Sequence, residues 1–363
     1  MLNQNREGIR HMRTVFIDAN PLCQQTTGFQ RMIFETLRSL DALLVENESD
    51  LEVHVCYPKG LHAPLPAFEK IKVDEVRSPR WLPWPLVSLP FFVWRHHGLL
   101  CRMATGLCLY KPSILAIHDM RPQKFKEYDV FRVRVNTIIS NYVAKILSHQ
   151  LVTVSYTIKK EIEDILHIPP ERIQVIYNGW QHMQRIPEDE SVWETYPQLK
   201  KGNYYFALGS VARHKNYEWL LAVAQKHPDD IFAVSGMLNA RKLPVGIQLQ
   251  EAPSNVVYVG YVSDAQCKTL MKHCKAFLQP SKYEGFGIPP LEALSVGARI
   301  CVSNASCLPE IYEDCAYYFD PDDYNVDLNV LLQGTVSPPD RLLARYSWDT
   351  AANQWLRLLE QRV

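Results

Sequence analysis

Two glutamates eight positions apart bracket a glycine-rich turn in this chain. Glu284 precedes the run Gly285-Phe-Gly287, and Glu292 follows it after two prolines. Glycines leave backbone N–H groups unshielded and a helix N-terminus adds a positive dipole, so the turn favours an anion, most often phosphate. A carboxylate on each side of a bound diphosphate would accept hydrogen bonds from hydroxyl groups. This matches the layout of a sugar nucleotide, in which the ribose and the sugar lie on either side of the two phosphates. The alternative is an ordinary strand-to-helix turn with solvated carboxylates.

A second candidate anion site is the run Gly-Ser-Val-Ala-Arg-His-Lys-Asn at residues 209–216. It joins an apolar strand pattern to a helical pattern, with Asn216 as a candidate N-cap. Arg213 and Lys215 place two cations beside the positive end of that helix, which suits a diphosphate leaving group. The alternative is a solvated basic turn.

A histidine ends another predicted strand. Residues 113–119 finish with His118-Asp119, at the strand end where α/β proteins place their sites. A lone histidine in such a position is more often structural than catalytic. Gly28 lies in a strand–glycine–helix unit near the start of the chain and is by itself a turn residue. That unit lacks the G-x-G-x-x-G fingerprint, which argues against a simple dinucleotide oxidoreductase.

The composition excludes several classes of protein. The 363 residues favour two domains, and 39 basic against 39 acidic residues give no indication of wholesale nucleic-acid binding. Nine scattered cysteines without a C-x2-C pair predict neither a zinc site nor a disulfide framework and fit a reducing cytosol. We also expect no signal peptide and no transmembrane helix, because no apolar run has the required length.

Strand and helix patterns alternate along the chain, which predicts an α/β fold with parallel sheets. Apolar stripes at helical spacing follow the strand patterns, for example at residues 29–40 and 158–166. Residues 183–202 are mostly polar and suit an interdomain linker. The predicted strands cover residues 14–19, 51–57, 113–119, 150–155, 172–179 with a final turn, 204–209, 231–236, 256–262, 276–280 and 299–303, and a capped helix covers 347–359.

The run Glu284-Gly-Phe-Gly-Ile-Pro-Pro-Leu-Glu292 resembles the E-x7-E signature of the retaining GT-B glycosyltransferases, in particular glycosyltransferase family 4. The resemblance covers residues 13–363 and is most specific over 204–295. It implies two Rossmann-like parallel-sheet domains that face a central cleft. By this pattern the domains are an N-terminal acceptor domain (12–182), a linker (183–202), a C-terminal donor domain (203–346) and a helix that crosses back to the first domain (347–363).

The resemblance also implies roles for single residues. The catalytic roles fall on His118, which approaches the sugar and the acceptor, on Glu284, which holds the sugar hydroxyls, and on Arg213 and Lys215, which bind the donor phosphates. The donor-binding roles fall on Gly28, Gly285, Phe286, Gly287, Ile288, Glu292 (for the ribose), Gly260, Tyr261 and Val262. Two departures stand out. Ser210 replaces an arginine that many members carry, and Trp180-Gln-His182 differs from the usual continuation.

The function that the resemblance implies is retaining transfer of a hexose, such as mannose, rhamnose, fucose or glucose, from a nucleotide-diphosphate sugar. The acceptor would be a glycan or lipid-linked oligosaccharide in bacterial surface polysaccharide (O-antigen or capsule) synthesis, and the enzyme would be cytoplasmic. No metal or other cofactor is expected, because Asp320-Pro-Asp322 resembles an ordinary turn of the family. The nucleotide stays open. The alternatives are a sugar-nucleotide epimerase with a GT-B fold and a non-catalytic sugar-nucleotide binder.

Residues 80–103 interleave large aromatic side chains with basic and imidazole side chains. One interpretation is a peripheral contact with the inner face of the cytoplasmic membrane or with a lipid-linked acceptor, in which aromatic rings enter the interface and cations meet lipid phosphates. The other interpretation is that these aromatic residues pack the core of the N-terminal domain. The prolines in this segment make a long helix improbable before residue 91.

Overall fold

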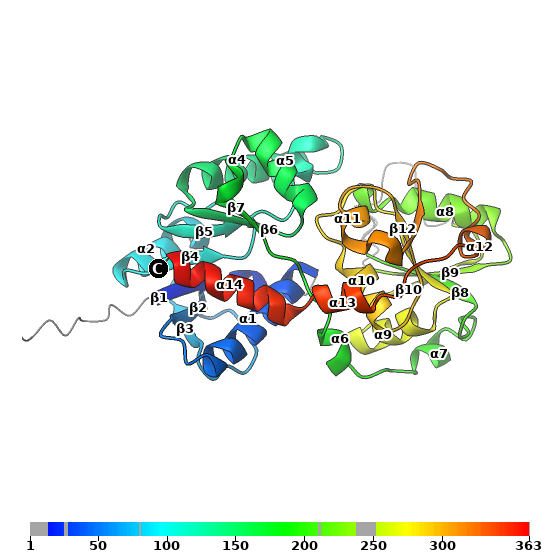
Figure 1. Ribbon diagram of the computed structural model, residues 1–363, viewed down its shortest axis with the longest axis horizontal. Helices are drawn as coiled ribbons and strands as arrows, with labels where there is room; N and C mark the ends of the chain where they lie inside the picture. Colours follow the sequence, from blue (N-terminus) through cyan, green and yellow to red (C-terminus); the bar gives the residue numbers. More distant parts are fainter. Residues whose placement is uncertain (1–13, 25–27, 80, 210–211, 237–251, 363) are drawn as a thin grey trace, which may run out of the picture. The chain divides into compact units, whose positions relative to one another are not determined.

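Parallel strands connected by helices build two sheets (Figure 1). The structure is a computed structural model that describes residues 14–24, 28–79, 81–209, 212–236 and 252–362. The first sheet has seven strands in the order β3-β2-β1-β4-β5-β6-β7. These strands are β1 (Thr14–Asp18), β2 (Glu52–Pro58), β3 (Lys72–Val76), β4 (Leu99–Arg102), β5 (Ser113–Ala116), β6 (Gln150–Thr153) and β7 (Ile173–Val175).

The second sheet has six strands in the order β10-β9-β8-β11-β12-β13. They are β8 (Tyr204–Leu208), β9 (Ile231–Ser235), β10 (Val256–Gly260), β11 (Ala276–Gln279), β12 (Ile300–Ser303) and β13 (Tyr317–Phe319). Strands such as β11 and β12 are buried at every residue, which explains their continuous apolar runs. The predicted α/β class with parallel sheets is confirmed. The short strands β3, β4 and β13 were not predicted.

Helices follow most of the strands. The long ones are α1 (Gly28–Glu46), α4 (Phe131–Leu147), α5 (Tyr156–Leu166), α8 (Tyr217–Lys226), α9 (Asp264–His273), α10 (Ile288–Ser295) and α14 (Trp348–Arg362). The short ones are α2 (Leu89–Arg95), α3 (Arg121–Lys124), α6 (His182–Arg185), α7 (Val192–Thr195), α11 (Leu308–Tyr312), α12 (Leu328–Leu331) and α13 (Asp340–Arg345). Single turns are η1 (Asn20–Cys23), η2 (Trp84–Ser88), η3 (Pro170–Arg172), η4 (Arg213–Lys215) and η6 (Glu313–Cys315).

Helix caps decide where several of these helices begin. Ser155 caps α5 by accepting a hydrogen bond from the N–H of Ile158, as its sequence position predicts. Ser263 forms a capping box with Gln266 at the start of α9. The N-cap position predicted for Asn216 is confirmed, but its side chain makes no capping hydrogen bond. Asn216 occupies the N-cap position of α8 in the left-handed conformation, and its amide instead donates to the carbonyl of Pro321 at 2.8 Å.

Contacts divide the chain into two compact units. Unit 1 contains residues 1–116, 139–151 and 352–363, and unit 2 contains residues 117–138 and 152–351. The core of the second sheet lies in unit 2, where side chains from β8, β9 and α8 pack together, among them Tyr205, Trp219 and Phe232. All the predicted site residues except Gly28 belong to unit 2. The predicted domain boundaries at 182 and 203 stay a prediction.

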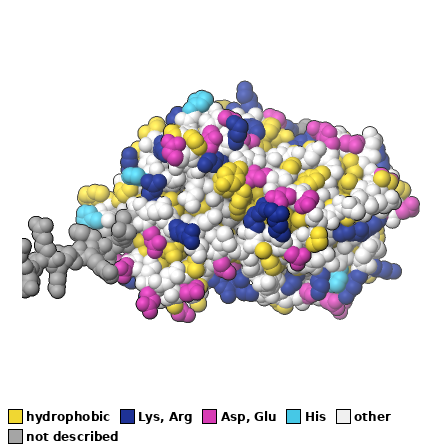
Figure 2. Space-filling model, viewed as in Figure 1, with side chains coloured by type: hydrophobic (Ala, Val, Ile, Leu, Met, Phe, Trp, Pro, Cys, Tyr) yellow, Lys and Arg dark blue, Asp and Glu magenta, His cyan; other side chains and the backbone are white. Residues whose placement is uncertain are grey.

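The aromatic segment 81–103 divides between the two interpretations. Trp84 is buried, and its indole N–H donates to Asp18 at 2.9 Å. Arg102 is also buried and pairs with Asp18 at 2.8 Å, so it is not free to meet lipid phosphates. Trp81 and Trp94 are by contrast 80% and 61% exposed. Figure 2 shows hydrophobic side chains among charged ones of both signs on the visible face. Within the described residues, no helix is long and apolar enough to span a membrane.

Candidate active site

The strand order of the second sheet reverses between β8 and β11. From β8 the chain proceeds outward through β9 to β10, and from β11 it proceeds in the opposite direction through β12 to β13. In open α/β sheets, ligands bind at the carboxyl ends of the strands where the order reverses. A pocket lies at this place, and its lining includes Leu208, Gly209, Lys215, Tyr217, Gln279 and Pro280. The fold therefore supplies a candidate ligand site at the carboxyl ends of β8 and β11.

Two glycines bring the backbone close together beside this pocket. Gly209 follows β8 and Gly236 follows β9, with φ angles of +148° and +146°. A Cβ atom on Gly236 would lie 2.0 Å from the carbonyl oxygen of Gly209, so only glycine fits there. Gly236 N–H in turn donates to the carbonyl of Gly260 at the end of β10. Three neighbouring strand ends are thus held together by main-chain contacts and carry no side chains there.

Lys215 and Glu284 meet at the pocket. Lys215 Nζ donates to Glu284 Oε1 at 2.7 Å, and Gln279 Nε2 donates to the same oxygen at 2.7 Å. Burial alone would raise the pKa of Glu284, but the charge of Lys215 and hydrogen bonds from Lys215 and Ser281 outweigh it and hold the pKa below its ordinary value. Glu284 is therefore an ionised carboxylate that only accepts hydrogen bonds, and Lys215 keeps two further donor positions.

The glycine loop after Glu284 is held from several directions. Ser306 Oγ donates to the carbonyl of Glu284 at 2.7 Å, and Ser155 Oγ donates to the carbonyl of Gly285 at 2.8 Å. A Cβ atom on Gly285 would lie 2.2 Å from the carbonyl oxygen of His118. The main chain at His118 therefore lies directly against this loop. Gly285 is required by that close approach.

The residues that follow Gly285 meet different surroundings. Phe286 is buried, with its ring beside Tyr177 and Tyr346, so its side chain packs the interior and only its main chain is available to a ligand. Gly287 has a φ of +84° and precedes Ile288, the first residue of α10. The N-terminus of α10 therefore lies directly after the loop, as predicted. Because positions 289 and 290 are prolines, Ile288 is the first-turn residue that supplies an N–H.

His214 is a site residue that the sequence interpretation missed. Its Nε2 lies 3.2 Å from Nη1 of Arg121, and a guanidinium only donates, so Nε2 accepts and the ring proton lies on Nδ1. Burial, together with the charges of Lys215 and Arg121, lowers the pKa of His214 to about 3. The ring is thus neutral, and within the described residues its buried Nδ1 has no hydrogen-bond partner. The sequence signal that could have indicated His214 is its position between Arg213 and Lys215.

Two arginines near His214 and Lys215, Arg121 and Arg213, differ in their surroundings. Arg121 forms a two-bond ion pair with Asp129, at 3.1 Å for each bond, in addition to its contact with His214. Arg213 is exposed, and its Nη1 lies 3.4 Å from the carbonyl of Glu127. Arg121 is therefore already paired, whereas the charge of Arg213 is open to solvent.

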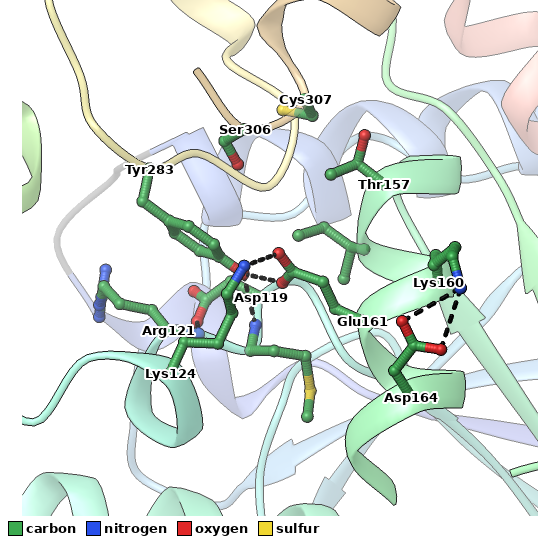
Figure 3. A network of polar contacts seen from close by, with 12 residues as sticks. Asp119, Arg121, Lys124, Thr157, Lys160, Glu161, Asp164, Tyr283, Ser306 and Cys307 are labelled. Atoms are coloured by element: carbon green, nitrogen blue, oxygen red, sulfur yellow. Dashed lines mark hydrogen bonds and ion pairs between the residues drawn. The ribbon is translucent and has the colours of Figure 1, made fainter. Parts of the chain in front are cut away.

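A polar network connects the glycine loop with the segment after His118 (Figure 3). The hydroxyl of Tyr283 donates to Glu161 at 2.5 Å and accepts from the N–H of Met120 at 2.9 Å. Lys124 forms an ion pair with Glu161, on the same carboxylate, and lies over the ring of Tyr283. Burial raises the pKa of Tyr283 above its ordinary value, so the hydroxyl keeps its proton. Sequence patterns gave no signal for this network, because its members come from distant segments.

Glu292 is held by a histidine. His182 Nε2 lies 2.7 Å from Glu292 Oε1, and the indole Nε1 of Trp348 lies 3.1 Å from His182 Nδ1. His182 and Trp348 are each 2% exposed, whereas the side chain of Glu292 is 12% exposed. Glu292 therefore faces partly outward while its partners are internal. His182 belongs to the segment that departs from the family pattern.

Glu310 lies at the N-terminus of α5. Its carboxylate accepts from the N–H groups of Tyr156 and Thr157 at 2.8 and 2.7 Å and from the Thr157 hydroxyl at 2.7 Å. Tyr177 OH is a further donor at 3.1 Å. A carboxylate in this position satisfies free N–H groups and favours the helix dipole. Its role is thus to join α11 to α5.

The other predicted site residues lie at or next to the ends of strands and helices. Tyr261 is 67% exposed and Gly260 ends β10, with Val262 next to them. Gly28 begins α1 in unit 1 and is exposed, so its role in donor binding stays a prediction. The departure at Ser210 lies outside the described residues. Asp322 pairs with Lys282, and its N–H donates to Asp320, which makes an ordinary turn.

Comparison with known proteins places these elements in context. Residues 193–327 match the family model described as Glycosyl transferases group 1. The chain is 29% identical over 336 residues to O-antigen chain mannosyltransferase B of Escherichia coli, covering 85% of this chain and 84% of that protein. It is 26% identical over 262 residues to O-antigen chain mannosyltransferase RfbU of Salmonella typhimurium, covering 69% of this chain and 70% of that protein.

Among solved structures, sucrose-phosphate synthase from Thermosynechococcus elongatus matches with a TM-score of 0.73 and 13% identity, covering 96% of this chain and 98% of that chain. At this identity the similarity concerns the fold. The similarity extends over the strands of both sheets.

Proposed function

We propose that this chain is a GT-B glycosyltransferase, because residues 193–327 match the family model of glycosyl transferases group 1 and two relatives of 26% and 29% identity are named as glycosyltransferases. It transfers a hexose, with retention of configuration, from a nucleotide-diphosphate sugar to a glycan or lipid-linked oligosaccharide in bacterial O-antigen or capsule synthesis. The two O-antigen relatives are named mannosyltransferases, which favours mannose as the hexose. The observation that carries the proposal is the Lys215–Glu284 pair at the switch point of the second sheet.

In this proposal the diphosphate lies against Lys215, Arg213 and the N–H groups of the glycine loop. As the bond between the anomeric carbon and the phosphate oxygen breaks, negative charge grows on the leaving diphosphate. Cations and N–H dipoles that are already in place stabilise this charge more in the transition state than in the ground state, which accelerates the reaction. The protein thereby supplies the charge that a metal ion would otherwise supply.

Glu284 holds the hydroxyl groups of the transferred sugar. Its carboxylate is ionised and fixed by Lys215 and Gln279, so it accepts hydrogen bonds from hydroxyl groups in a defined place. The acceptor hydroxyl attacks the anomeric carbon from the face that the diphosphate leaves, and its proton passes to the leaving phosphate. One C–O bond breaks and one forms on the same face, which retains the configuration. His118 contacts the sugar or receives the acceptor.

The testing experiment measures donor binding first and transfer second. Thermal stabilisation by GDP-mannose, UDP-glucose and dTDP-rhamnose identifies the donor, because a ligand that binds the native state raises its stability. Transfer to a lipid-linked acceptor is then followed, with and without EDTA, and the anomeric configuration of the product is determined by NMR. The proposal expects an unchanged rate in EDTA and a retained configuration. An inverted product or loss of activity that added metal restores would overturn those parts.

The same assay distinguishes the two alternatives. An epimerase would release an epimerised sugar nucleotide in the absence of any acceptor. A non-catalytic binder would be stabilised by a sugar nucleotide and leave it unchanged with every acceptor. Either result would replace glycosyl transfer as the function.

We further propose a peripheral membrane contact, since lipid-linked acceptors lie at a bilayer surface. Trp81, Phe91 and Trp94 are exposed, and α4 exposes Phe131 and Ile146, at 75% and 70%, on a helix without acidic residues. Exposed aromatic and aliphatic side chains near cations suit an anionic interface. Co-sedimentation with phosphatidylglycerol vesicles should fall when the two tryptophans and Phe91 are replaced by serine, and phosphatidylcholine vesicles should bind less. Equal binding of the variant would contradict this contact.

A further inference from the structure

The orientation of His182 follows from its two partners. The indole of Trp348 has an N–H donor and no acceptor, so His182 Nδ1, 3.1 Å from it, must accept. The ring proton of the neutral imidazole therefore lies on Nε2, and Nε2 donates to Glu292 Oε1 at 2.7 Å. The order Trp348, His182, Glu292 is thus a directed relay of two hydrogen bonds that ends on a carboxylate.

The main chain fixes the beginning of this relay. The side chain of Gln181 accepts a hydrogen bond from the N–H of Trp348 at 3.0 Å. A Cβ atom on Gly179 would lie 2.3 Å from the same nitrogen, so glycine permits the close approach of the two segments. His182 is 2% exposed and held at both ring nitrogens. It has neither a second orientation nor solvent access to weaken its bond to Glu292.

The relay leaves one side of the carboxylate available. His182 takes Oε1 of Glu292, and within the part of the chain that the structure describes Oε2 accepts no hydrogen bond. The donor is a neutral imidazole rather than a cation, so this contact brings no positive charge to the carboxylate. A long carboxylate side chain that is already ordered loses less rotamer freedom when it binds a ligand.

We propose that His182 is a positioning residue that orients Glu292 to accept the two ribose hydroxyls of the donor and so makes the site selective for ribonucleoside diphosphates. This inference rests on the proposed function, in which Glu292 holds the ribose. Trp348 acts through His182 by fixing the ring proton on Nε2. The segment Trp180-Gln-His182, which departs from the usual family sequence, then supports the donor site through the contact of His182 with Glu292.

The test compares a nucleotide with and without ribose hydroxyls in the same variant. Dissociation constants are measured for GDP and for 2′,3′-dideoxy-GDP, with the UDP pair used where UDP is the nucleotide that binds. Wild type should prefer the ribonucleotide strongly. His182→Phe fills the space without a donor and should weaken GDP binding by about tenfold or more, as expected for a lost hydrogen bond to a charged group. It should leave the dideoxy nucleotide nearly unaffected.

Two further variants separate positioning from a general structural effect. Glu292→Ala combined with His182→Phe should bind GDP no more weakly than Glu292→Ala alone, because both act on the same contact. Trp348→Phe keeps His182 but removes the donor that fixes its tautomer, so it should show a smaller loss of the same selectivity and serves if His182→Phe does not fold. In each, the donor KM should rise while kcat changes little.

The outcomes distinguish this inference from the function on which it rests. If wild type binds none of the nucleotides, the proposed function fails. If wild type prefers the ribonucleotide but His182→Phe weakens both nucleotides equally, glycosyl transfer stands and the positioning role is overturned.

Discussion

Lys215 Nζ lies 2.7 Å from Glu284 Oε1, although 69 positions separate the two residues in the chain. The contact joins the basic turn after β8 to the glycine loop after β11, the two strands at which the sheet order reverses. The cation that we propose for the leaving diphosphate and the carboxylate that we propose for the sugar hydroxyls are therefore joined by one hydrogen bond. The proposed chemistry requires this closeness, because the bond that breaks joins the sugar to the diphosphate.

Replacement of Lys215 by methionine should reduce turnover strongly. It removes a donor aimed at developing charge, and the loss of one such donor lowers kcat by about 10²–10³-fold. Steady-state kinetics with the sugar nucleotide that binds the wild-type protein measure this loss of kcat. The control is Lys282→Met, which removes a nearby cation that pairs with exposed Asp322 and not with Glu284. A similar loss in both variants would show that general positive charge, and not this contact, matters.

The two glutamates should divide between binding and turnover. Glu292→Ala is expected to weaken every nucleotide that binds, whichever sugar it carries, by about tenfold or more because charged hydrogen bonds to the ribose are lost. Glu284→Gln should reduce kcat more than nucleotide affinity, because in the proposed reaction Glu284 contacts the sugar and not the nucleotide. Calorimetric titration with nucleoside diphosphate, compared with kcat, separates the effects. Equal binding losses for both variants would contradict the division.

Stability should decline in mild acid because of His214. The pKa of His214 is lowered from 6.5 to about 3 in the folded protein, so the unfolded chain binds its proton first as the pH falls. The stabilisation is complete above pH 6.5 and is lost progressively towards pH 3, by at most about 1.4 kcal/mol per pH unit. Glu284 has a lowered pKa and adds a loss only as pH falls below its ordinary value of 4.5.

Urea unfolding at pH 7, 6 and 5 tests this titration. His214→Gln stays neutral throughout and should show a flatter dependence of the free energy of unfolding on pH. The control is His62→Gln, at an exposed position, which should keep the wild-type slope. The same slope in wild type and His214→Gln would contradict the assignment.

The close approach at Gly285 should make that glycine irreplaceable. A methyl group there would lie 2.2 Å from the carbonyl oxygen of His118, a main-chain atom that has little room to shift. Gly285→Ala should therefore destabilise the fold by about 1–3 kcal/mol, as overpacking does, and lower activity. Gly334→Ala is the matched control, since its nearest contact would be 3.3 Å. Thermal melts of the two variants measure the difference, and equal melting temperatures would refute it.

The carboxylate of Glu310 should stabilise α5 from its N-terminus. Glu310→Gln keeps the side-chain length but loses the charge that two main-chain N–H groups and the Thr157 hydroxyl face. We expect a loss of about 1 kcal/mol in the free energy of unfolding, typical of a lost helix cap. Glu313→Gln, which breaks an exposed pair with Arg345, should cost less. A larger loss in the control would show that charge at this surface matters in general.

The sequence by itself determined the fold class and the local geometry of the two candidate anion sites. Continuous apolar runs such as 276–279 become buried parallel strands because both faces of such a sheet are covered. Gly287 and the following prolines specify a helix start through their own φ preferences. These signals are local, since each depends on residues a few positions apart. The same signals predicted the N-cap position of Asn216 but not its side-chain contact, because the amide donates to the distant carbonyl of Pro321.

Only the tertiary structure decided which side chains share a site and in which protonation state. His182 lies 110 positions from Glu292, and Tyr283 lies 122 positions from Glu161. No periodicity or spacing encodes such pairs, because strand order and loop closure bring them together. The proton on His182 Nε2, the neutral ring of His214 and the ionised Glu284 depend on burial and on neighbouring charges, which exist only once the chain has folded.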